Sequence, residues 1–277
     1  HLFSLIRMVA VLQVSRSGYY AWRKSGLTPS PRALKRAERD VLIKEAFDDS
    51  KARNGSRRIQ VDLAEHGKKP DIKTILNSME RQGLVAKAAR KFKVTTDSKH
   101  SLPVAPNLLE QDFSATGPNQ KWVGDITYLM TSEGWLYLAV IIDLYSRAVI
   151  GWSMSNRMTA DLVCGALNMA LFRRGFPKKV IVHSDRGSQY CAYDYQKKLQ
   201  AYGLRPSMSG TGNCYDNASV ETFFKSLKAE LIWRQKWSTR RQAEAAIFQY
   251  INGFYNPRRR HSYLGGISPL AFEAKGA

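Results

Sequence analysis

The stretch from residue 122 to residue 154 reads WVGDITYLMTSEGWLYLAVIIDLYSRAVIGWSM. It contains three runs rich in Val, Ile, Tyr and Trp, separated by turns of two or three residues. Such runs predict β-strands, and strands joined by connections this short must be antiparallel. The predicted strands are Trp122–Thr131, Trp135–Leu144 and Arg147–Met154.

Helical and strand-like segments alternate after these strands. Leu162, Ala166 and Ala170 recur every fourth residue and predict a helix that ends near Gly175. The other predicted elements are a strand over 179–183, a helix over 188–202, a strand over 204–208 and helices over 214–233 and 239–255. The order β-β-β-α-β-α-β-α predicts an α/β fold.

The region before the strands is predicted to be all-α. Apolar residues spaced three, four and seven apart predict helices over 57–65 and 72–79, separated by a Gly- and Pro-containing turn. Such a pair can place its second helix in the major groove of DNA, with Arg57 and Arg58 as candidate contacts. An ordinary helical hairpin has the same pattern, and the basic charge favours the DNA-binding interpretation.

Pro and Gly residues between 98 and 120 interrupt any helix or central strand, and they predict a linker there. The predicted organisation is a helical, helix-turn-helix-like DNA-binding region over 1–97 and a core over 121–235. A C-terminal helix and basic tail over 236–277 are expected to pack on the core.

Charge favours a nucleic acid partner. The 277 residues include 43 Lys and Arg against 23 Asp and Glu, a formal net charge of +20. No apolar stretch is long enough to span a membrane and no signal-peptide pattern is present, so we expect a soluble, intracellular protein. The three cysteines lack CxxC spacing and indicate neither a disulfide framework nor a zinc ribbon. Because the chain starts at His1 rather than Met, we expect a further segment upstream.

Three acidic residues stand where functional groups are often exposed. Asp125 lies inside the first predicted strand, where carboxylates are depleted; a buried, hydrogen-bonded Asp and a metal ligand explain it equally well. Asp185 follows a predicted strand at its carboxyl end, where α/β sites cluster, although it also fits a simple turn. Glu221 shares a helix row with Lys225 and Lys228, a pattern that also fits a solvated row of salt bridges.

A strand Asp, a strand-end Asp and a helix Glu can converge at one edge of a mixed sheet. Two carboxylates about 4 Å apart repel by roughly 4 kcal/mol at an effective dielectric near 20, so three of them need cations. Oxygen ligands without thiolate or clustered imidazole favour Mg²⁺ or Mn²⁺ over zinc. Two such ions roughly 3.5–4 Å apart support in-line attack of a water or 3′-hydroxyl on phosphorus. A basic protein with an acidic metal site therefore predicts phosphodiester chemistry.

The segments around these acids resemble the Asp-Asp-Glu motifs of retroviral-integrase-like transposases. They read WVGDITY at 122–128, HSDRGSQY at 183–190 and NASVETFF at 217–224. The second and third acids are separated by 35 residues, as in that group. Lys228 lies seven residues after Glu221, where the group carries a basic residue.

Nearly the whole chain is similar to the second-frame (OrfB) product of the bacterial insertion sequence three family, including VSRSGYYAW at 14–22 and YNPRRRHSYLG at 255–265. One departure is Asn54, which stands where an aromatic residue is expected. The resemblance implies a ribonuclease-H-like core, a mixed five-stranded sheet flanked by helices. Asp125 would lie on its first strand, Asp185 just after its fourth and Glu221 on its catalytic helix.

The resemblance also implies metal-dependent DNA strand transfer by a polynucleotidyl transferase. Asp125, Asp185 and Glu221 would hold two Mg²⁺ ions, with Mn²⁺ as a substitute, and the enzyme would nick 3′ ends and join them to a target. Expected partners are element terminal repeats, target DNA, other copies of the chain in a synaptic complex, and an upstream-frame (OrfA) product or fused N-terminal segment. The expected location is the bacterial cytoplasm, in association with the nucleoid.

Several residues near the triad or in the tail are candidate DNA contacts, with phosphate as the expected ligand and salt-dependent binding as the consequence. They are Lys225, Lys228, Arg186, Gln189, Arg258, Arg259 and Arg260. The two lysines also fit a solvated helix face, and the residues at 186 and 189 also fit a role in ordering their loop.

Three further features receive structural interpretations. The Gly-rich segment 210–215 lacks the spacing of a phosphate-binding loop and is expected to shape the site as a mobile loop. His183 has no second imidazole or thiol nearby in sequence, so it is expected to be packed rather than to bind zinc. Asp143 has no matching family position and is assigned to structure.

Two other functions fit the same fold. A non-catalytic or domesticated DNA-binding protein could retain the integrase fold, but all three acids are present. A ribonuclease of this fold would cut RNA in hybrids, but the 35-residue gap and Lys228 fit transposases better.

Overall fold

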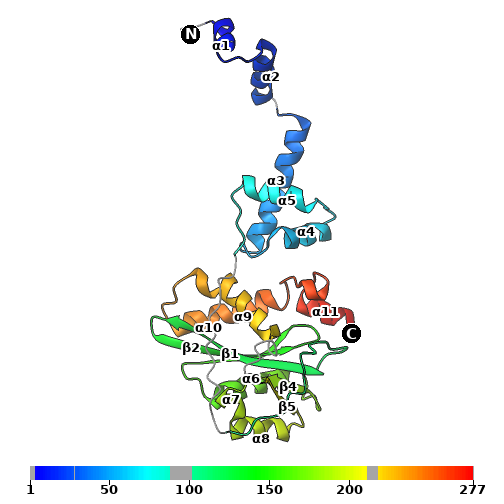
Figure 1. Cartoon of the computed structure of the whole chain (residues 1–277), viewed down its shortest axis with the longest axis vertical. Helices are drawn as coiled ribbons and strands as arrows, with labels where there is room; N and C mark the ends of the chain where they lie inside the picture. Colours follow the sequence, from blue (N-terminus) through cyan, green and yellow to red (C-terminus); the bar gives the residue numbers. More distant parts are fainter. Residues whose placement is uncertain (1–3, 28, 88–101, 211–217, 277) are drawn as a thin grey trace. The chain divides into compact units, whose positions relative to one another are not determined.

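The structure is a computed structural model that describes residues 4–27, 29–87, 102–210 and 218–276. The chain divides into two compact units, residues 1–87 and 88–277, each with its own hydrophobic core (Figure 1). The boundary expected at 97/98, most of the Gly-rich segment 210–215 and Cys214 lie outside the described residues. Within the described ranges, no helix combines the length and apolarity needed to cross a membrane.

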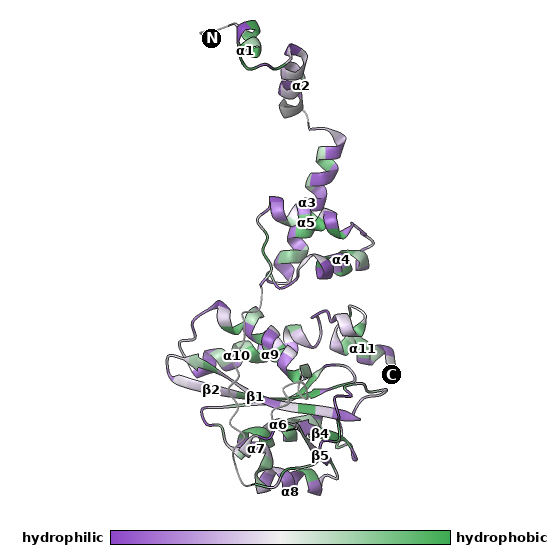
Figure 2. Ribbon diagram, in the orientation of Figure 1, coloured by the Kyte–Doolittle hydropathy of each residue, from purple (hydrophilic) through white to green (hydrophobic). Residues whose placement is uncertain are grey.

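The first unit is helical, as predicted. Its helices are α1 (Leu5–Val11), α2 (Arg16–Leu27), α3 (Pro31–Asp49), α4 (Ser56–Glu65) and α5 (Ile72–Arg81). Ile43, Ile59 and Ile75 join α3, α4 and α5 in one small core, while hydrophilic residues cover much of the outer helix faces (Figure 2). The side chain of Asp71 begins α5 by accepting a hydrogen bond from the backbone N–H of Lys73 at 2.9 Å.

Asn54 has a structural role at the start of α4. Its side chain is buried and donates from Nδ2 to Asp62 Oδ2 at 2.7 Å. Its backbone N–H donates to the hydroxyl of Ser50 at 3.1 Å. Hydrogen bonds therefore fix this turn at the position where the family resemblance leads one to expect an aromatic residue.

The second unit is built on the predicted mixed five-stranded sheet. Its strands are β1 (Lys121–Thr131), β2 (Gly134–Asp143), β3 (Val149–Ser155), β4 (Ile181–Ser184) and β5 (Arg205–Met208). They lie in the order β3-β2-β1-β4-β5. The first three strands pair antiparallel, whereas β4 pairs parallel with both β1 and β5.

Helices cover both faces of this sheet (Figure 1). On one side lie α6 (Ala160–Arg173), α7 (Ser188–Cys191) and α8 (Tyr193–Ala201); on the other lie α9 (Ala218–Glu230) and α10 (Arg240–Tyr250). Alternation along β2 serves both layers, because Leu138 and Val140 join the α9 and α10 core while Ala139 and Ile141 join the α6 and α8 core.

Two predicted helices are interrupted. The helix expected over 188–202 breaks at Ala192, whose extended backbone (ψ 141°) separates α7 from α8 and lets Tyr190 and Tyr195 both be buried, edge to face. The helix expected over 239–255 ends as α10 at Tyr250 and continues as one π-helical turn. Asn256 follows that turn, and its side-chain amide bonds both the N–H and the C=O of Val149 on edge strand β3 at 2.9 Å.

Part of the range 98–120, where the sequence predicts a linker, lies against the sheet. The backbone N–H of Leu108 donates to Ser207 Oγ at 2.8 Å, and the carbonyl of Pro106 accepts from Met208 N–H at 3.3 Å. Leu109 is buried in the core under α9. The segment before β1 therefore packs as part of the second unit, because its apolar side chains and backbone groups find partners there.

The tail after α10 packs on the same unit and ends in α11 (Pro269–Gly276). Glu273 of α11 accepts hydrogen bonds from Arg174, at the end of α6, and from the hydroxyl of Ser146. The ring of Phe272 lies 5.1 Å from that of Tyr145. These contacts attach the tail to the end of α6 and to the turn between β2 and β3.

Candidate active site

The register of the sheet brings two of the predicted acids together. Val123 on β1 pairs with His183 on β4 in parallel, so two residues further on Asp125 lies beside Asp185, which follows the end of β4. Adjacent strands lie about 4.8 Å apart. Asp185 also forms the turn expected as its alternative role, because its Oδ1 accepts the backbone N–H of Gly187 at 2.9 Å.

The third acid approaches from α9. Val220, Phe223 and Leu227 bury this helix against the sheet in the core that also contains Val123. Asp125 has the same strand parity as Val123 and so lies on the α9 side of β1. Glu221, off the apolar stripe, is 37% exposed at its side chain. The helix that carries Glu221 thus packs on the face of the sheet to which Asp125 belongs.

The charges of these acids interact. Burial raises the pKa of Asp125 well above its usual range, and the charges of Asp185 and Glu221 raise it further. The backbone N–H of Ile126, which donates to Asp125 Oδ1 at 2.7 Å, and the charge of Lys228 act in the opposite direction. The same burial and the charges of Asp125 and Asp185 raise the pKa of Tyr190. At both side chains the neighbouring carboxylates thus add to the effect of burial.

The two lysines of α9 lie in different environments. Lys228 is 8% exposed, and its Nζ lies 5.6 Å from the ring centroid of Tyr128. Burial lowers the pKa of Lys228, an effect that the charge of Asp125 opposes. Lys225 is 51% exposed and its Nζ lies 3.8 Å from Glu221 Oε2, which matches the salt-bridge alternative. One ammonium thus belongs to the carboxylate cluster and the other to its solvent side.

Arg186 and Gln189 order their loop. Arg186 donates from Nε to the carbonyl of Ser209 at 2.7 Å. Gln189 donates from Nε2 to the carbonyl of Met158 at 3.2 Å. Arg186 thus connects the loop after β4, and Gln189 the short helix α7 that follows it, to neighbouring segments, which matches the structural alternative to DNA contact.

Arg259, a candidate phosphate contact, is buried and paired with a carboxylate in this structure. Its side chain is 8% exposed, and its guanidinium donates to Glu230 and to Ser226 of α9. Arg259 is therefore committed to a buried ion pair. Arg258 is exposed, and Arg260 is half-buried with its Nη1 3.4 Å from the carbonyl of Gly266.

The remaining DNA-contact candidates belong to the first unit. Arg57 is exposed on the first turn of α4. Arg58 is half-buried and donates to the carbonyl of Arg53 at 3.4 Å.

His183 and Asp143 fit their structural assignments. The ring nitrogens of buried His183 bond the hydroxyls of Ser207 and Ser209 at 2.8 and 3.2 Å. Asp143 is fully buried, accepts the backbone N–H of Asn119 at 2.9 Å and of Tyr145 at 3.0 Å, and lies 3.7 Å from Arg174. Both side chains have their hydrogen-bonding capacity used by the fold.

Arg147 is a residue that the sequence reasoning missed. It lies in the turn between β2 and β3 with φ +60° and donates to the hydroxyl of Ser219 on the first turn of α9. Its guanidinium also stacks 4.1 Å from the ring centroid of Tyr263. No local periodicity marks such a residue, because its partner Ser219 lies 72 positions away in the chain.

The donor set fits a divalent cation. Among the residues that the structure describes, no three His, Cys, Asp or Glu side chains are arranged to hold a metal ion together. The triad nevertheless supplies only carboxylate oxygens, the ligands that Mg²⁺ and Mn²⁺ prefer. Burial, and then the charges of Asp185 and Glu221, raise the pKa of Asp125, and a cation beside it would favour its charged form.

The raised pKa of Asp125 predicts that Asp125→Asn stabilises the metal-free protein. Because folding raises the pKa of Asp125, the native state loses stability as pH rises above the ordinary Asp value, at about 1.4 kcal/mol per pKa unit. We expect the variant to gain at least about 1 kcal/mol at pH 8 in EDTA and nothing near pH 3.5. Urea unfolding at both pH values measures this; an equal gain at both would contradict the electrostatic cause.

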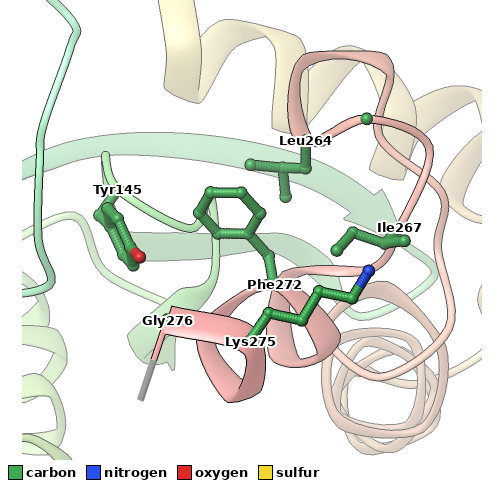
Figure 3. Close-up of a pocket in the computed structure, with 7 residues that line it drawn as sticks. Tyr145, Leu264, Ile267, Phe272, Lys275 and Gly276 are labelled. Atoms are coloured by element: carbon green, nitrogen blue, oxygen red, sulfur yellow. The ribbon is translucent and has the colours of Figure 1, made fainter.

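A pocket of about 380 Å³ lies elsewhere, at the tail (Figure 3). It is lined by Tyr145, Leu264, Gly265, Ile267, Phe272, Lys275 and Gly276. None of the three acids lines it, so this pocket is separate from the candidate active site.

The integrase core domain family matches residues 115–214, and a second family of the same description matches residues 221–276. Over 273 residues the chain is 55% identical to transposase InsF of insertion sequence IS3A from Escherichia coli (strain K12), covering 99% of this chain and 95% of that protein. The chain belongs to the insertion sequence three (IS3) family of transposases. It is also 47% identical over 268 residues to an uncharacterized 31 kDa protein of insertion element IS600 from Shigella sonnei, covering 97% and 98% of the two chains.

Two solved structures are similar to this IS3-family chain. The HTLV-2 integrase catalytic core domain in complex with magnesium is 18% identical, with a TM-score of 0.43, over 58% of this chain and 99% of that one. A chain of the simian T-cell lymphotropic virus intasome is 17% identical, with a TM-score of 0.46, over 77% and 70%. The integrase core match and the sheet order confirm the predicted ribonuclease-H-like fold of the second unit.

Proposed function

We propose that this transposase catalyses Mg²⁺-dependent nicking at the 3′ ends of its element and joins those ends to target DNA. The observation that carries the proposal is the electrostatic interaction at Asp125, whose pKa is raised by burial and further by the charges of Asp185 and Glu221. Membership of the transposase family supports DNA as the substrate, and a net charge of +20 suits a polyanion.

Each acid has a role in this proposal. Asp125, Asp185 and Glu221 would hold two Mg²⁺ ions, which supply activation of the attacking oxygen and charge stabilisation at the phosphorus. The core under α9 holds the helix of Glu221 against the sheet, and the turn at Gly187 orients Asp185. Lys228 contributes positive charge beside Asp125.

DNA would contact basic side chains around this edge and in the first unit. Lys225 is the exposed cation next to Glu221, and Arg258 is exposed in the tail. We further propose that Arg57 and Arg58 contact the terminal repeats. Phosphate contacts of this kind make affinity fall steeply with salt. The proposed assembly contains further copies of the chain and an upstream-frame segment, on DNA in the bacterial cytoplasm and nucleoid.

A strand-transfer assay tests the proposal. The full chain, with and without the upstream-frame product, is incubated with labelled duplexes of the element ends in Mg²⁺ or EDTA. Nicked and joined products are expected only with Mg²⁺. DNA binding without any product would favour a non-catalytic protein, and cleavage confined to an RNA–DNA hybrid would favour a ribonuclease.

A further inference from the structure

The helix that carries Glu221 is held at both ends by arginines from other parts of the chain. Arg147 donates to the hydroxyl of Ser219 in the first turn of α9. Arg259 donates from Nη2 to Ser226 Oγ at 2.8 Å and to Glu230 Oε1 at 2.8 Å in the last turns. Glu221 lies between these two attachment points.

The attachment at the C-terminal end of α9 is a buried hydrogen-bond network. The side chains of Arg259 and Glu230 are 8% and 5% exposed. The hydroxyl of Tyr250 also donates to Glu230 Oε2, at 2.7 Å. A buried ion pair with this many hydrogen bonds has one well-defined geometry, because any displacement leaves a buried charge unpaired. The network therefore fixes the last two turns of α9 in their rotation about the helix axis and in their position along it.

The attachment at the N-terminal end depends on the tail as well. The guanidinium of Arg147 lies against the ring of Tyr263, 4.1 Å from its centroid, and Nη2 approaches the carbonyl of Phe113 at 3.4 Å. Tyr263 and Arg259 both belong to the segment after α10. One tail segment thus braces both ends of the helix.

We propose that Arg147 and Arg259 are positioning residues that set Glu221 against Asp125 and Asp185 for metal binding. This inference rests on the proposed function. An α-helix is stiff and rises 1.5 Å per residue, so a shift at either attachment moves Glu221 with it. Mg²⁺ requires near-ideal octahedral geometry, and a displacement of about 1 Å at a reacting centre can lower a rate by roughly 100-fold.

The structure supplies a matched control in Arg174. It also forms an arginine–carboxylate ion pair that attaches the tail to the core, through Glu273 and Asp143. These two ion-pair partners lie on α11 and at the end of β2, outside α9. Arg174→Gln should therefore lower stability without moving Glu221.

The test compares Arg147→Gln, Arg259→Lys and Arg174→Gln in the full chain. Three quantities are measured: the Mn²⁺ dissociation constant by electron paramagnetic resonance, the melting temperature, and the joining rate at saturating DNA. We expect about 10-fold weaker Mn²⁺ binding for the first two variants, in the range seen when groups behind metal ligands are changed. Their joining rates should fall roughly 10- to 100-fold with unchanged DNA affinity. Arg174→Gln should lower the melting temperature alone.

Milder variants keep the test decisive if an arginine variant does not fold. Ser219→Ala and Ser226→Ala each remove one hydrogen-bond acceptor and leave the three acids unchanged. Each should weaken Mn²⁺ binding by about threefold, which corresponds to a loss of roughly 0.6 kcal/mol in binding free energy. Wild-type Mn²⁺ affinity in all these variants, or an equal loss in Arg174→Gln, overturns the inference. Glu221→Gln distinguishes failure of this inference from failure of the proposed function. If this variant binds Mn²⁺ and joins DNA normally, the proposed function itself fails.

Discussion

Changing Asp125 to Asn, Asp185 to Asn or Glu221 to Gln is expected to lower the rates of 3′-end nicking and joining by at least about 1,000-fold, because residues that act as one catalytic unit lose most of its function with any member. Each change keeps the size of the side chain and removes the negative charge that a divalent cation needs. DNA binding should survive, since phosphate contacts come from basic side chains. Single-turnover assays at saturating DNA, with a parallel gel-shift titration, measure both quantities.

Asp143→Asn is the matched control for these substitutions. Asp143 is a fully buried acid of the same sheet, but its partners are Asn119, Tyr145 and Arg174 rather than the triad. The variant should melt at a lower temperature and still join DNA at close to the normal rate where it is folded. Normal strand transfer by any one triad variant would refute the catalytic assignment.

The fold could be predicted from the sequence because its signals are local. The strand pattern over 122–154 and the turns between its runs require only neighbouring residues, and the structure reproduces the three antiparallel strands. The proximity of Asp125 and Asp185 could also be predicted, because parallel strands of one sheet bring their carboxyl ends to the same edge. The helix break at Ala192 could not be predicted from local sequence, because it depends on burying Tyr190 and Tyr195 together.

The three consecutive arginines of the tail show a feature that local sequence cannot predict, namely which of them is buried. Arg258, Arg259 and Arg260 have the same charge and nearly the same sequence context, so the pattern predicts one role for all three. The structure separates them because Glu230, 29 residues earlier, lies opposite Arg259. Which cation is buried depends on that distant carboxylate, which no periodicity within the tail reports.

The contact between β3 and α6 leaves no room for a side chain at Gly151. A Cβ atom on Gly151 would lie 2.2 Å from the carbonyl oxygen of Ala166 and 2.8 Å from both the Cβ and the backbone nitrogen of Ala170. All three are atoms of a buried helix or its short side chains, so the methyl group cannot be accommodated by rotating a flexible side chain. Strand and helix must separate, and both sides of that contact lie in the core.

Gly151→Ala is therefore expected to lower the free energy of unfolding by about 3 kcal/mol or more, at the upper end of overpacking effects. For a domain of this size that corresponds to a fall of roughly 6–12 °C in melting temperature. Gly253→Ala is the control, because the nearest atoms to a Cβ there are the side-chain atoms of Gln249 at 3.5–3.8 Å; it should melt within about 2 °C of the parent, as unstrained substitutions do. Thermal unfolding followed by circular dichroism measures both variants. If Gly151→Ala had the melting temperature of the parent protein, α6 would have to lie further from β3 than described. The helix layer on that face of the sheet would then be packed less tightly than the contacts of Ala166 and Ala170 indicate.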